Sequence, residues 1–180
     1  QSVIVPGERG KVREKPYHKQ PEKYIMMPAN AKRRHPIVEK RLREMSDWAC
    51  TAPLNRWEVG SGNSLGIICS STCYQYVREV CPDDVSVLKL GMIWPMPDEL
   101  IRKFAESVER LVVVEELDPF IEEHCRALGL EVEGKSLFPM EGEISQDLVA
   151  EKLGYPVPKG IEHVDEIPAR PPVMCAGCPH

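Results

Sequence analysis

Residues 110–129 read RLVVVEELDPFIEEHCRALG, and they indicate the fold class more strongly than any other stretch. Arg110 to Val114 form the strongest short apolar run and predict a buried strand. Asp118 followed by Pro119 favours the start of a helix, and Gly129 stands where a glycine commonly ends one. A strand followed at once by an amphipathic helix is the repeating unit of α/β proteins.

The same unit recurs on both sides of this stretch. Upstream, the pattern predicts strands over 65–69 and 85–90 and helices over 72–80 and 97–108, with Ser70 to Thr72 as capping residues. Downstream, it predicts a short fourth strand over 130–132 and a last helix from Ser145 to Gly154. We therefore predict an α/β fold of three layers, with a mainly parallel sheet and helices on both faces.

Proline-rich segments flank this unit. Closely spaced prolines predict an extended, irregular arm over residues 1–33, and Pro36 suits the first position of a helix over 36–49. A loop follows that helix, and residues 155–180 are again rich in proline. We expect an arm and helix over 1–63, an α/β domain over 64–154, and a linker over 155–180.

Charge is distributed unevenly along the 180 residues, which carry a net charge of −5. Residues 1–43 hold 12 Lys and Arg against 4 Glu, so their balance is +8, and the remainder balances at −13. The arm offers few aromatic side chains for stacking on bases, so we expect no nucleic-acid partner. We favour an arm that packs against its own acidic body or a neighbouring domain. No apolar run is long enough to span a membrane, and we expect no membrane partner.

Seven cysteines are present, an odd number, and most lie in apolar or helical stretches. This usage favours reduced thiols and a cytoplasmic location. Cys175 and Cys178 alone have the C-x-x-C spacing with which two thiolates grip one metal ion or cluster iron. A metal or cluster site needs about four ligands, so partners for this pair would lie outside the chain.

Three segments fall at predicted carboxyl ends of strands, where ligands gather in α/β sheets. Ser70 to Thr72 could meet an anion, although helix capping is the simpler interpretation. The loop 91–97 could line a pocket with Trp94 or serve as a rigid turn. Glu115 and Glu116 could act as acids or bases, but adjacent residues on an extended chain point in opposite directions. We expect one to be a structural partner and the other to be solvated.

Several ordered motifs resemble the large (alpha) subunit of indolepyruvate:ferredoxin oxidoreductases. They are residues 65–68, Val87-Leu-Lys-Leu-Gly91, Trp94-Pro-Met-Pro97, residues 112–116 with 119–123, Gly142-Glu143, and Arg170-Pro-Pro172 running into Cys175-x-x-Cys178. The resemblance covers nearly the whole chain and implies the middle domain, which is similar to the C-terminal domain of transketolase.

The resemblance implies an enzyme that oxidatively decarboxylates aryl 2-oxoacids to acyl-CoA and CO2 and reduces ferredoxin. It implies thiamine diphosphate, Mg2+ and [4Fe-4S] clusters as cofactors, coenzyme A as co-substrate, and neighbouring thiamine-binding domains, a beta subunit and ferredoxin as partners. The cofactor-activating glutamate, the metal-diphosphate motif and the four-cysteine ferredoxin pattern have no counterpart here. We therefore expect no catalytic residue and no cofactor in this chain alone, and an inactive fragment.

Three functions follow as hypotheses. The first is a non-catalytic scaffold and interface domain within the larger enzyme. The second is a domain that contributes to a coenzyme A or substrate pocket through Trp94 and the strand ends. The third is a metal or redox module built on Cys175 and Cys178, which the resemblance places at the opening of the next thiamine-binding domain. The Cys-Pro-His ending differs from the Cys-Gly of the pyruvate enzymes, whose cysteine pair holds a cluster.

Overall fold

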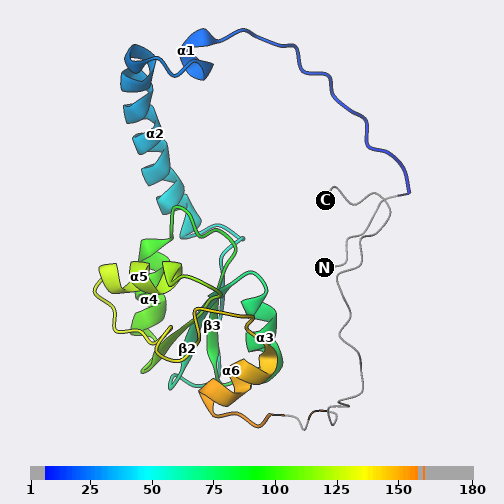
Figure 1. Ribbon diagram of the computed structural model, residues 1–180, viewed down its shortest axis with the longest axis vertical. Helices are drawn as coiled ribbons and strands as arrows, with labels where there is room; N and C mark the ends of the chain where they lie inside the picture. Colours follow the sequence, from blue (N-terminus) through cyan, green and yellow to red (C-terminus); the bar gives the residue numbers. More distant parts are fainter. Residues whose placement is uncertain (1–6, 158–159, 161–180) are drawn as a thin grey trace.

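A computed structural model describes residues 7–157 and Gly160, and it contains one four-stranded sheet (Figure 1). The strands are β1 (Arg56–Glu58), β2 (Gly66–Ser70), β3 (Ser86–Leu90) and β4 (Leu111–Val114), in the spatial order β1-β3-β2-β4. β2 pairs in parallel with both β3 and β4, and only β1 runs antiparallel. The predicted mainly parallel sheet is thus confirmed.

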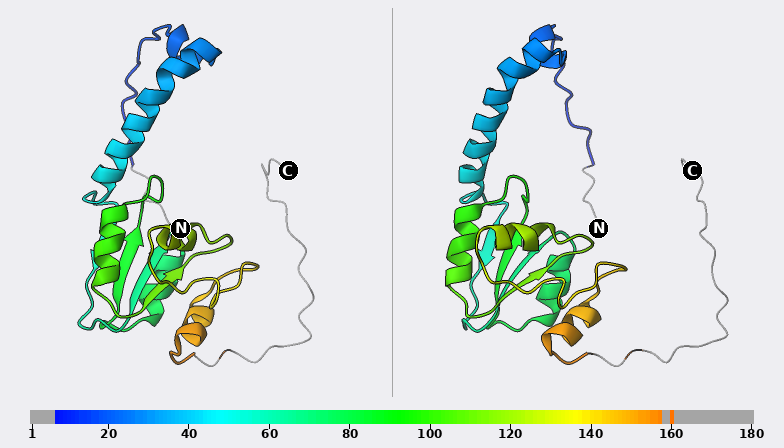
Figure 2. Two further views of the ribbon diagram at one scale, coloured as in Figure 1. Left: turned by 90° about the vertical axis from the view of Figure 1, so that its left-hand side faces the viewer. Right: turned by 60° about the vertical axis from the view of Figure 1, so that its left-hand side comes forward.

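Two helix layers cover the sheet. Helices α3 (Cys73–Val80) and α6 (Gln146–Leu153) pack on one face, and α4 (Asp98–Glu106) and α5 (Phe120–Ala127) pack on the other. Figure 2 shows the sheet between these layers. Each layer forms around its own hydrophobic cluster, so the predicted three-layer arrangement is the observed one.

Successive side chains of the central strands belong alternately to the two hydrophobic clusters. Ile67 of β2 and Val112 of β4 are buried toward α3 and α6, whereas Ile68 and Val113 are buried toward α4 and α5. Successive residues of a strand point to opposite faces of the sheet, so a strand buried on both faces must be apolar throughout. This is why the apolar runs in the sequence predicted these strands.

The N-terminal part departs from the prediction. α1 (Pro21–Tyr24) and α2 (Pro28–Ala49) are helical, so the arm is not extended throughout and the long helix begins well before Pro36. Pro28 takes the first helical position, and the following residues include the good helix formers alanine, lysine and arginine. The Asn30 side chain also donates to the Ile25 carbonyl at 3.0 Å, which ties the start of α2 to the turn after α1. Pro36 is accommodated inside the helix.

α2 stands away from the α/β body (Figure 1). Only its C-terminal end is anchored: Ala49 is fully buried and Ser46 donates to the Met96 carbonyl at 2.8 Å. Every described residue from 7 to 29 is exposed. The prediction that the arm packs against its own acidic body is therefore wrong for these residues, and the alternative, packing against a neighbouring domain, stays a prediction.

Two predictions about strands also need correction. The segment after α2 is not simply a loop, because Arg56–Glu58 form β1 against β3. Three residues are too few to show a periodic pattern. β1 is held instead by tertiary contacts, such as the edge-on packing of Trp57 against Phe104, whose ring centroids are 5.5 Å apart. The predicted strand 130–132 is reduced to a single bridge between Glu133 and Val112.

No helix among the described residues is long and apolar enough to cross a membrane. Cys175 and Cys178 lie outside the described residues.

Candidate functional site

The carboxyl edge of the sheet carries two adjoining hollows, of about 380 and 250 Å³. Ser70, Ser71, Thr72 and Ile93 line both. Lys89 and Gln75 contribute to the larger hollow, and the smaller one is lined by Glu115, Glu116, Asp118 and Phe120, among others. The structure thus brings together residues from the three segments that the sequence singled out.

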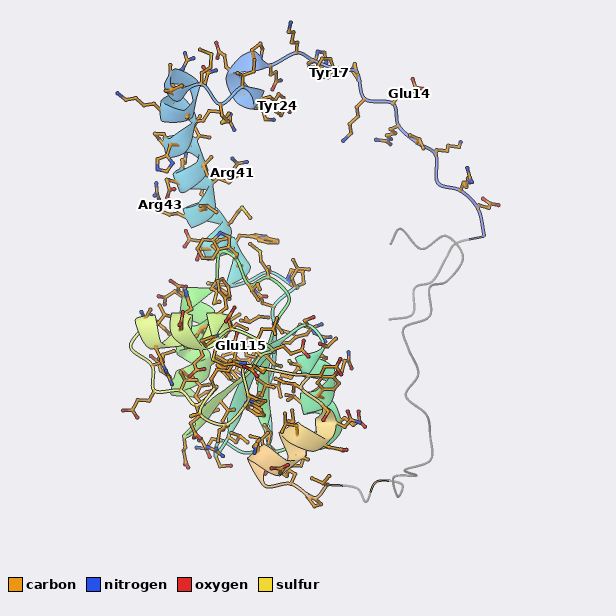
Figure 3. The ribbon with its side chains drawn as sticks, in the orientation of Figure 1. Glu14, Tyr17, Tyr24, Arg41, Arg43 and Glu115 are labelled. Atoms are coloured by element: carbon orange, nitrogen blue, oxygen red, sulfur yellow. The ribbon has the colours of Figure 1, made fainter. Side chains whose placement is uncertain are left out.

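Glu115 and Glu116 do not form an acid–base pair. The Glu115 carboxylate is buried and accepts hydrogen bonds from the backbone N–H groups of Ile121 (2.8 Å) and Glu122 (2.9 Å), at the start of α5. Figure 3 shows Glu115 within the α/β body. Burial raises the pKa of Glu115, while the two N–H donors act in the lowering direction. Glu116 is exposed, so the expected division into a structural and a solvated carboxylate is confirmed.

A second buried carboxylate, which the sequence analysis missed, holds the next loop in place. Glu122 is 2% exposed, receives the backbone N–H of Lys135 at 2.7 Å, and pairs with Arg126 at 2.6 Å. Lys135 in turn donates its Nζ to the Glu115 carbonyl at 2.6 Å. The i,i+4 spacing of Glu122 and Arg126 was the available signal, but it is also common on solvated helix faces.

The polar residues after β2 do not cap α3. Thr72 occupies the N-cap position with helical backbone angles (φ −67°, ψ −32°), and its side chain makes no capping hydrogen bond. A side-chain cap requires an extended backbone at that position. Ser71 is in the left-handed region (φ 51°), which turns the chain sharply from β2 into α3. The prediction that Ser70 to Thr72 act as caps is therefore wrong.

Hydrogen bonds connect the loop after β3 to the C-terminal end of α2. The Asn55 side chain accepts from the backbone N–H groups of Gly91 (2.9 Å) and Met92 (3.0 Å) and donates to the Ala49 carbonyl at 2.9 Å. Trp94 is 62% exposed and lies against Phe120, with ring centroids 6.3 Å apart. This loop is therefore a rigid turn that presents an exposed indole beside the smaller hollow.

The described cysteines are free thiols, and four of the five are buried. Burial raises the pKa of Cys73 and Cys81 to about 11 and that of Cys125 to about 12, and it raises the pKa of Cys69 further still. Such thiols are protonated at neutral pH and do not attack or bind metal readily. Within the described part of the chain, no group of three or more His, Cys, Asp or Glu side chains is placed to hold a metal ion.

Comparison with known proteins matches this chain to a segment of longer subunits. The chain is 33% identical over 186 residues to the indolepyruvate oxidoreductase subunit IorA of Pyrococcus horikoshii. It is 36% identical over 200 residues to IorA of Methanothermobacter marburgensis. The matches cover 91% and 99% of this chain. This chain is homologous to a segment of IorA. It spans 29% and 32% of the length of those two subunits, and no family model matches it.

A solved structure supports the fold. The 2-oxoglutarate:ferredoxin oxidoreductase from Magnetococcus marinus, with 2-oxoglutarate, coenzyme A and succinyl-CoA bound, aligns with a TM-score of 0.55. The aligned part covers 72% of this chain and 23% of that one, at 18% sequence identity. At this identity the likeness shows a shared α/β architecture. It identifies no shared ligand site.

Proposed function

We propose that this chain acts as a non-catalytic scaffold and interface domain in an indolepyruvate-type 2-oxoacid:ferredoxin oxidoreductase subunit. The observation that carries the proposal is the IorA identity over 91–99% of the chain, which spans only about 30% of IorA. The complete enzyme would oxidatively decarboxylate aryl 2-oxoacids to acyl-CoA and CO2 and reduce ferredoxin.

The carboxyl edge supports a structural role. Both Glu115 oxygens hold the start of α5, Lys135 holds the Glu115 carbonyl, and Asn55 fixes the loop after β3. These groups are bound within the domain itself, so they are poorly placed to move protons on a substrate. Among residues 7–157, no three His, Cys, Asp or Glu side chains gather as the protein ligands of a metal ion or cluster would.

The proposal assigns the cofactors to other parts of the subunit. Thiamine diphosphate, Mg2+ and [4Fe-4S] clusters would belong to domains joined through residues 1–63 and 155–180. Cys175 and Cys178 would become ligands only in the longer subunit. The beta subunit and ferredoxin would be partners of the whole enzyme. We place that enzyme in the cytoplasm on the odd number of cysteines and their apolar or helical setting in the sequence.

A chimeric subunit tests this proposal. Residues 1–180 would replace the homologous segment of M. marburgensis IorA, and reduction of ferredoxin would be followed with indolepyruvate. We expect the chimera to keep at least about a tenth of the parent rate, because the domain supplies no reacting group. The same chimera with Val113→Asp, which disrupts the sheet, serves as the negative control. A folded chimera that reduces no ferredoxin would contradict the proposal.

A second candidate function is a contribution to a coenzyme A or substrate pocket. It is favoured by the hollow that Lys89, Ser71 and Ile93 line at the carboxyl edge, where ligands of α/β sheets gather. Millimolar coenzyme A should then raise the melting temperature of the chain, and Lys89→Glu should abolish the rise. Lys103→Glu, at an exposed position of α4, is the matched control. An unchanged melting temperature would exclude this candidate.

A further inference from the structure

A short protrusion follows β4. Glu116, Leu117 and Asp118 are all exposed, and the Leu117 side chain is 64% exposed between two carboxylates. The backbone of Leu117 is in the left-handed region (φ 57°), which is costly for a residue other than glycine. Glu116 to Asp118 thus present one apolar side chain flanked by negative charge, and we call them the acidic knob.

The arm carries a surface of the opposite charge. A hollow of about 470 Å³ lies between α1 and α2, and Pro21 and Ile37 contribute apolar surface to it. Its other lining residues include Lys19, Lys23, Arg33 and Arg34, with Glu22 as the one carboxylate. Arg34 also lines two further hollows along α2, which makes it central to this surface. We call this the basic hollow.

The basic hollow cannot reach the acidic knob of its own chain. α2 has 22 residues, which corresponds to about 33 Å, and its C-terminal end is fixed by buried Ala49 and by Ser46. The helix points away from the body, so the hollow lies at its distant end (Figure 1). Figure 3 likewise shows Tyr24 and Arg41 on the arm, well away from Glu115.

We propose that the basic hollow receives the acidic knob of a second copy of this chain. The acidic knob presents one apolar side chain between two carboxylates, and the basic hollow presents apolar surface among four cationic side chains. The two surfaces are therefore complementary in charge and in apolar contact. The wider distribution agrees, because residues 1–43 balance at +8 and the remainder at −13. Since each chain carries both surfaces, a two-fold dimer satisfies both contacts reciprocally. α2 pairing with α2 would instead bring two basic helices together.

Sedimentation of residues 1–180 tests the dimer. We expect a dimer at tens of micromolar that weakens as salt is raised, because the contact is electrostatic at its rim. Arg34→Glu and Glu116→Lys should each weaken the dimer about tenfold or more. Lys103→Glu and Glu99→Lys change the net charge equally at exposed positions of α4 and should leave the dimer unchanged. Circular dichroism confirms that each variant is folded.

Mixing the two variants gives the decisive result. Consider a dimer of one Arg34→Glu chain and one Glu116→Lys chain. In one contact the altered basic hollow of the first chain meets the altered acidic knob of the second, so both charges are reversed and still attract. In the other contact both surfaces are native. The mixture should therefore form a dimer about as tight as the parent, although each variant alone dimerises about tenfold or more weakly than the parent. A monomeric parent, or a mixture that stays monomeric, would overturn the inference. Neither result would affect the chimera assay, so this inference and the proposed function can fail separately.

Discussion

Glu115 and Glu116 are chemically identical neighbours with opposite environments. The end of β4 turns Glu115 inward, where its carboxylate meets the first N–H groups of α5, and turns Glu116 into solvent. We predict that Glu115→Ala lowers the free energy of unfolding by about 2–3 kcal/mol, because two buried N–H groups lose their acceptor. Glu116→Ala should cost less than about 0.5 kcal/mol. Urea titration of both variants measures the difference, and equal losses would contradict this account.

The pair formed by Arg110 and Glu133 gives a prediction about pH. Arg110 donates to both Glu133 oxygens, at 2.7 and 2.9 Å, and this lowers the pKa of Glu133 below its ordinary value of 4.5. A lowered pKa in the folded state stabilises the fold above that ordinary value, and the contribution is lost as pH falls through the lowered pKa. Both side chains are 41% exposed, so the contribution at pH 7 is below about 1 kcal/mol.

Replacing Glu133 tests this pair. Glu133→Gln should be slightly less stable than the parent at pH 7, and the two proteins should converge in stability as pH falls below 4.5 toward the lowered pKa. Urea titrations at several pH values provide the measurement. A stability difference that widens on acidification would show that the sign of the shift is wrong.

At the scale of elements, the largely apolar runs predicted β2, β3 and β4, because strands buried on both faces are mostly apolar. β3 also contains Ser86 and the half-buried Lys89. The sequence could not predict β1, since Arg56 to Glu58 show no such run and owe their pairing to β3 and Phe104. The sequence did indicate most of the polar residues around the candidate site. It could not predict their roles, because these depend on local backbone angles and on which loop packs over each side chain. Thr72 does not cap because its backbone is helical, and Glu122 is buried because loop 133–138 closes over it.

Val113 tests the assignment of the central sheet. Its side chain is 1% exposed and lies in the cluster beneath α4 and α5. Val113→Asp places an unpaired carboxylate there and should cost about 3–5 kcal/mol of unfolding free energy. Glu109→Gln, at an exposed position just before β4, should change it by less than about 0.5 kcal/mol. Thermal melts followed by circular dichroism compare the two, and a Val113→Asp variant that melts like the parent would refute the sheet assignment.

At the scale of the whole molecule, the body and the arm have separate tasks. Both hydrophobic clusters draw their members from residue 57 onward, whereas the arm exposes its apolar side chains, such as Ile37 at 56%. Removal of residues 1–43 therefore takes almost no buried surface from the body. It keeps Ser46, Ala49 and Asn55, which hold the C-terminal end of α2 against the body.

We predict that residues 44–180 fold alone and melt within about 5 °C of the full chain, since the loss of a few exposed contacts shifts a domain of this size only slightly. The same truncation removes the basic hollow, so the proposed dimer should disappear while the fold remains. Circular dichroism and sedimentation of the truncated chain measure the two outcomes independently. An unfolded truncation would mean that the arm belongs to the core, and a truncation that still dimerises would place the interface on the body rather than on α1 and α2.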